Sequence, residues 1–116
     1  MNPINDLDAI SQPRHHFVGR TYIRELHLPL AGLTALSHKH ATDHASILGS
    51  GSVLFTVDGL TSRIDAPAVI EVPAGKVHSV TALTDNVTWF CIHSIPRALA
   101  ESKRVEDVDA VVIAKE

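Results

Sequence analysis

Histidine is the residue whose number and spacing in this chain most directly suggest chemistry. The sequence contains eight histidines, against three Phe and one Tyr. His38 and His40 are two positions apart, so near a strand end both imidazoles project from the same face of a sheet. His44 follows a short turn and can point back at them, and His78 follows a sharp turn made by Pro73-Ala74-Gly75. Because neutral imidazole is the commonest protein ligand of transition metals, these histidines are candidate ligands of one metal ion.

The segments that carry these histidines have the pattern of short β-strands. Apolar residues alternate or form short runs bounded by Gly, Pro or Asp, with no helical period. Asp58-Gly59 predicts a type I′ hairpin, and Asp85-Asn86 predicts a second tight turn. Many short strands between such turns favour an all-β fold, a small jelly-roll barrel. The predicted strands are 21–28, 33–37, 44–48, 52–57, 60–64, 68–72, 78–83 and 87–93.

Length and composition predict a single domain over residues 1–116. The chain is 45% hydrophobic, which is enough to form one core, and its 116 residues are too few for two domains. We expect an N-terminal arm over residues 1–20, the barrel core over 21–95 and a C-terminal extension over 96–116. Within the extension, Ala98 to Arg104 are expected to form one or two helical turns, and Val111 to Ile113 an edge strand.

Charge and hydropathy exclude several classes of partner. Ten basic and thirteen acidic residues are interspersed, with no basic stripe of the kind that nucleic acid requires. Apolar runs are far too short to cross a membrane, and the first residues lack the pattern of a secretory signal. Cys91 is the single cysteine, which fits a reducing compartment. We therefore expect a cytoplasmic protein that binds neither nucleic acid nor a membrane.

Two sequence motifs resemble those of the cupin superfamily. The first cupin motif is Gly, five residues, His-x-His, three or four residues, Glu, six residues, Gly. The second is Gly, five residues, Pro-x-Gly, two residues, His, three residues, Asn. The positions of this chain that match are Gly32, His38, His40, Gly51, Pro73, Gly75 and His78. The positions that depart are His44 for Glu, Pro67 for the second motif's first Gly, and Ala82 for Asn.

The resemblance implies a small single-domain cupin with a four-histidine site formed by His38, His40, His44 and His78. An all-imidazole set leaves a divalent ion its full charge, and four ligands leave two octahedral positions open. The ligand types do not distinguish Fe, Mn, Cu, Ni and Zn. Such proteins resemble oxidoreductases that use dioxygen or peroxide on a small organic molecule. The family also implies a homodimer.

Two other functions remain open. One is a non-catalytic module that binds a metal or small molecule; the other is a lyase or isomerase in which Tyr22 is the base. Strand parity makes Leu48, Trp89, Cys91 and His93 candidate lining of the cavity. Asp43 is a candidate to orient a ligand imidazole, although an exposed turn aspartate is the simpler interpretation. The remaining histidines, His15, His16 and His27, are expected at the surface.

Overall fold

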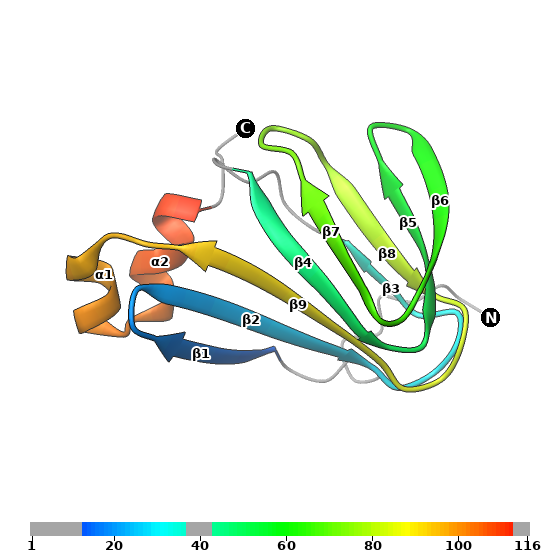
Figure 1. The fold of residues 1–116 in the computed structure, drawn as a ribbon, viewed down its shortest axis with the longest axis horizontal. Coiled ribbons are helices and arrows are strands. Elements are labelled where there is room, and N and C mark those ends of the chain that lie inside the picture. Colours follow the sequence, from blue (N-terminus) through cyan, green and yellow to red (C-terminus); the bar gives the residue numbers. More distant parts are fainter. Residues whose placement is uncertain (1–12, 37–42, 113–116) are drawn as a thin grey trace.

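The computed structural model describes residues 13–36 and 43–112. Two antiparallel sheets form around one core (Figure 1). The five-stranded sheet has the order β1-β2-β9-β4-β7, and the four-stranded sheet the order β3-β8-β5-β6. The strands are β1 (Arg14–Val18), β2 (Thr21–Leu28), β3 (Thr34–Leu36), β4 (His44–Ser50), β5 (Ser52–Val57), β6 (Leu60–Asp65), β7 (Ala68–Val72), β8 (His78–Ala82) and β9 (Val87–Ser94). From β2 to β9 the chain changes sheet after every strand except at the β5–β6 hairpin, which gives the predicted jelly roll.

The core is aliphatic with two large aromatic rings. Alternate residues of each strand point inward, as the burial of Val87, Trp89 and Cys91 along β9 illustrates. Phe55 of the opposite sheet stacks near Trp89, with ring centroids 5.7 Å apart. Since buried residues of both sheets belong to one cluster, the sheets pack face to face over this core.

Turn residues fix the strand ends where the sequence predicts them. Asp58 and Gly59 both have positive φ, +52° and +79°, as a type I′ hairpin between β5 and β6 requires. Gly51, the last glycine of the first motif, has φ +84°, and a Cβ there would lie 2.7 Å from side-chain atoms of Thr84 and Val87. The backbone at Gly51 therefore needs both the conformation and the small size of glycine.

The N-terminal arm prediction needs correction, because Arg14–Val18 form strand β1. It pairs with β2 at the edge of the five-stranded sheet, with Phe17 opposite Tyr22. Residues 1–12 lie outside the described residues.

The C-terminal extension contains two helices, α1 (Arg97–Ser102) and α2 (Val105–Val112). The helical turns after Pro96 are confirmed. The edge strand is wrong for Val111 and Val112, which belong to α2, and Ile113 lies outside the described residues. Both helices lie at one end of the five-stranded sheet, beside β1, β2 and β9 (Figure 1). There Val108 joins a second apolar cluster with Tyr22 and Ile95.

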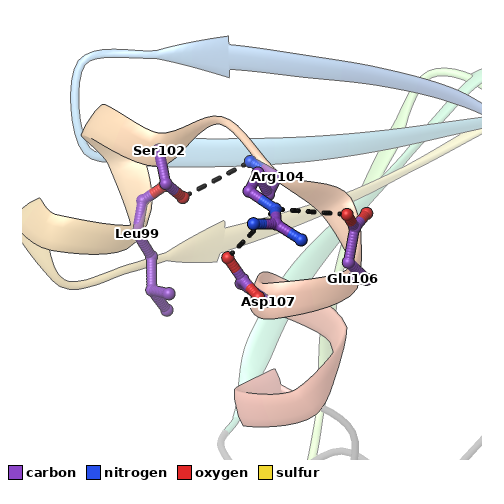
Figure 2. A network of polar contacts seen from close by, with 5 residues as sticks. All are labelled: Leu99, Ser102, Arg104, Glu106 and Asp107. Atoms are coloured by element: carbon purple, nitrogen blue, oxygen red, sulfur yellow. Dashed lines mark hydrogen bonds and ion pairs between the residues drawn. The ribbon is translucent and has the colours of Figure 1, made fainter.

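The junction between the helices is held by a polar network at the surface (Figure 2). Lys103 ends α1 in the left-handed conformation, and the Ser102 hydroxyl donates to the Leu99 carbonyl at 3.0 Å. Arg104 Nε donates to Glu106 Oε1 at 3.2 Å and lies 3.5 Å from Asp107 Oδ2. In the part of the chain that is described, neither helix has the length or the apolar composition to cross a lipid bilayer.

Candidate metal centre

Two predicted metal ligands face each other from opposite sheets. His44 is the first residue of β4 and His78 the first residue of β8. Their side chains are buried, with the residues 5% and 2% exposed, and their ring centroids are 6.0 Å apart. The sequence separates these residues by more than thirty positions, so it is the packing of the two sheets that brings the imidazoles together.

A hydrogen bond joins the two loops that lead into these histidines. Asp43 Oδ1 accepts from the Ala74 backbone N–H at 2.7 Å. Ala74 belongs to the predicted turn before β8, in which Gly75 has φ +74°. Asp43 is exposed, as the simpler interpretation predicted, and its carboxylate accepts from a backbone N–H. It thereby ties the start of β4 to the turn before β8.

His93 is buried beside His44. Ala45 of β4 pairs with Ile92 of β9, so the next pair in the register is His44 with His93. The two rings stack with centroids 4.5 Å apart, and His93 also stacks with Tyr22 of β2 at 6.0 Å. Three ring side chains therefore form a row across β2, β9 and β4 at the inner face of the five-stranded sheet.

Burial keeps the His44 and His78 imidazoles neutral at pH 7. Burial lowers the pKa of His44 from 6.5 to about 4, helped by charge repulsion from His93 and His78, while nearby Asp43 opposes the shift. The pKa of His78 is also lowered, again mainly by burial. A metal ligand must be the deprotonated imidazole, so both side chains are in the form that binds a cation.

The positions of these two rings fit a shared metal ion. Imidazoles bound at about 2.1 Å to one ion have ring centroids roughly 4.5–6 Å apart, depending on the angle at the ion. The other two predicted ligands, His38 and His40, lie in the segment 37–42, outside the described residues. Within residues 13–36 and 43–112 no group of three or more His, Cys, Asp and Glu side chains has the arrangement of a metal site. The four-histidine set thus remains a prediction.

Beneath this row lies a second inward-facing row. The register places Arg24 of β2 beside Cys91 of β9, and Cys91 beside Ser46 of β4. The Ser46 hydroxyl donates to Cys91 Sγ at 3.8 Å. Burial raises the pKa of the Cys91 thiol, so it is protonated at pH 7. Deeper still, Leu48 and Trp89 are fully enclosed in the core.

Sequence reasoning missed Arg24. A signal was available, because Arg24 alternates in step with Tyr22, Leu26 and Leu28 along the same strand. Those three side chains pack in the core, so an arginine among them is unexpected.

Tyr22 is the candidate base of the lyase alternative. It is 1% exposed, and its hydroxyl lies 2.8 Å from His15 Nδ1. The His15 ring is exposed and stacks on Tyr22, so this expected surface histidine also contacts a buried side chain. His16 is half-buried and lies 2.9 Å from Glu25, whereas His27 is half-buried on β2. The role of Tyr22 as a base stays a prediction.

A surface pocket of about 510 Å³ reaches His78 from outside the barrel. It lies between the β5–β6 turn and the loop before β8, and Thr56, Asp58 and Lys76 line it with His78. Lys76 Nζ and Asp58 Oδ2 form an ion pair of 3.2 Å beside it. The pocket borders His78, which is itself 2% exposed.

Comparison with solved structures relates this architecture to known proteins. KdgF from a Halomonas species superposes with a TM-score of 0.63 and 14% identity, over 82% of this chain and 94% of that protein. The Cupin_2 domain of an XRE family transcriptional regulator from Enterobacter cloacae gives 0.62 and 16%, over 77% and 99%. A cupin superfamily protein from Desulfitobacterium hafniense gives 0.58 and 18%, over 73% and 79%.

No protein-family model matches the sequence, and no curated protein does either. The relationship is therefore carried by structure. Two antiparallel sheets rolled around one core, with the similarity to these solved structures, establish that the chain has the cupin fold, a double-stranded β-helix.

Proposed function

We propose that this protein binds one divalent transition metal through His38, His40, His44 and His78 and acts as an oxidoreductase on a small organic molecule. The observation that carries the proposal is the convergence of His44 and His78, buried, neutral and 6.0 Å apart, from two sheets. A shared cation is the ligand that suits this donor type.

The surrounding residues define what the site offers a substrate. A bound ion would supply Lewis-acid or redox chemistry at its open coordination positions. His44 and His78 would hold that ion, while Trp89 and Leu48 exclude water beneath them. Asp43 would fix the spacing of the two ligand loops through its bond to Ala74. An aliphatic and aromatic wall of this kind suits a small organic molecule.

Metal content and turnover test the proposal together. Purified protein should bind about one equivalent of Fe, Mn or Cu, and the loaded protein should consume dioxygen or peroxide with some member of a panel of enols, diketones, thiols and alkenes. His44→Gln and His78→Gln should each lose most of the bound metal. His27→Gln, a change on the same sheet away from the site, should retain it. Absence of metal binding by the wild type would refute the proposal.

A non-catalytic binding module is the second candidate. The exposure of the acidic residues favours this function. Among the described residues no Asp or Glu side chain is buried, so no enclosed carboxylate beside His44 and His78 is placed to act as a general acid or base. Tight metal and ligand binding without turnover over the same panel would support this function over the oxidoreductase.

A further inference from the structure

Arg24 is a charged side chain on the inner face of the barrel. It alternates with Ile23 and Glu25 along β2 and shares its parity with Tyr22 and Leu28, which are buried in the two apolar clusters. Its register partner is Cys91, on the strand next to β2. Arg24 therefore lies one row below the row that contains Tyr22, His93 and His44.

No described residue neutralises this arginine. Arg24 Nε is buried, and no described residue accepts a hydrogen bond from it. No carboxylate in the described part of the chain forms an ion pair with the guanidinium either; Glu25, its neighbour on β2, faces outward and contacts His16 and Arg14 instead. Arg24 acts electrostatically on Cys91, where its charge opposes the effect of burial on the thiol.

The other side chains of this row are neutral. Cys91 is a protonated thiol and Ser46 a fully buried hydroxyl. None of the Asp and Glu residues that the structure describes is buried, so the inner faces of the two sheets carry the Arg24 charge without an enclosed counter-charge. Arg24 is half-buried, and burying its Nε without an acceptor costs free energy that an anion beside it would remove.

We propose that Arg24 binds the carboxylate of a small organic molecule inside the barrel, next to the candidate metal centre. A guanidinium presents parallel N–H donors that match the two oxygens of a carboxylate. A single arginine with one neutral hydroxyl nearby suits a singly charged group better than a phosphate. The proposal rests on the proposed function in one respect: the molecule held by Arg24 is the substrate of the metal site, which makes that substrate a small carboxylic acid.

Matched acid and amide pairs test the proposal on the full chain. Benzoate and pyruvate would be titrated against benzamide and pyruvamide, with and without bound Mn²⁺, while the Arg24 Nε–Hε resonance is followed by ¹⁵N NMR. The resonance is assigned by its loss in Arg24→Gln. We expect one or both acids to shift it saturably and the amides to leave it unchanged. Arg24→Gln should weaken binding of the acids about 10- to 100-fold.

Two variants control for folding and for general charge. Arg24→Lys keeps the charge but loses the paired donors, so it should bind acids with intermediate affinity. Arg97→Gln removes an exposed arginine at the start of α1 and should bind acids as the wild type does. Thermal unfolding of each variant shows whether it is folded.

The outcomes separate the two proposals. Equal affinity of Arg24→Gln and wild type for the acids, equal binding of acids and amides, binding of inorganic phosphate alone, or no binding of either acid at millimolar concentration would each overturn the role of Arg24. Failure of the wild type to take up metal would overturn the proposed function, while the Nε–Hε titration of the metal-free protein would still decide whether Arg24 binds carboxylates.

Discussion

The neutral imidazole of His44 links the candidate site to the stability of the metal-free protein. Its pKa is about 4 in the folded chain and 6.5 when unperturbed, so between these values the unfolded chain binds a proton that the folded chain does not. The contribution of neutral His44 to the free energy of unfolding should thus be fully present above pH 6.5 and should be lost as the pH falls toward 4. Urea unfolding from pH 8 to 4 measures this decline. His44→Gln should show a shallower decline, and an unchanged slope would contradict the assignment.

Asp43 should act on metal binding through loop position. Asp43→Ala removes the acceptor for the Ala74 N–H and frees the turn before His78. Groups that position ligands typically affect metal affinity 10- to 100-fold, so we expect Asp43→Ala to lower the metal affinity about tenfold. Asp43→Asn retains an acceptor and should bind metal with an affinity closer to that of the wild type. Competition with a chromophoric chelator measures the affinity.

Asp85→Ala is the matched control for this variant. Asp85 Oδ1 accepts from the Ala31 backbone N–H at 2.9 Å, an equivalent bond in a different loop pair. Both variants should lose a similar, small amount of stability, but only Asp43→Ala should weaken metal binding. Equal affinities in the two variants would show that the Asp43 bond serves the fold alone.

At the scale of elements, α2 should stabilise the folded protein through its apolar contact and hardly at all through the ion pairs at its start. Val108 is fully buried with Tyr22 and Ile95. Val108→Ala removes two buried methyl groups and should cost about 2 kcal/mol. Arg104, 63% exposed, forms the ion pairs of Figure 2, and Arg104→Ala should change the free energy of unfolding by about 0.5 kcal/mol or less. Chemical denaturation compares the two, and a reversed order would contradict this account.

The strands that the sequence predicted well are those with both alternation and turn signals. The predicted ranges 21–28, 52–57 and 68–72 coincide with β2, β5 and β7. β1 was missed because it is a short edge strand whose first three residues are polar and which has no fully buried side chain, although Gly19-Arg20 before β2 is a two-residue turn. Val111 and Val112 suggested a strand because of β-branching, but Val105, Val108 and Val112 have the i, i+3, i+7 spacing of a helix.

The candidate site was predictable only as far as residue types and local spacing allow. His44 and His78 were identified because each follows a recognisable turn. The adjacency of His93 to His44, and of Arg24 to Cys91, depends on which strands pair and in which register. Register is set by interactions across the whole sheet, so no local pattern specifies these contacts.

For the whole molecule, the outer face of the five-stranded sheet supports the predicted homodimer. The register aligns Ile23, Ile92 and Ala45 in one row across β2, β9 and β4. Phe90, Ile47 and Val69 align in the next row, and Val69 is 76% exposed. These side chains form an apolar surface bordered by Glu25 of β2 and Glu71 of β7, and pairing with a second copy would remove it from water.

Light scattering coupled to gel filtration should therefore give twice the 12.5 kDa mass of one chain. Ile47→Lys places a charge in the middle of this surface, and enclosing that charge against a second apolar face is costly, so the variant should elute as a folded monomer. Leu60→Lys is the control: Leu60 is 73% exposed but lies on β6, in the other sheet, and its variant should remain dimeric. A monomeric wild type would contradict the homodimer, and a dimeric Ile47→Lys would place the interface elsewhere.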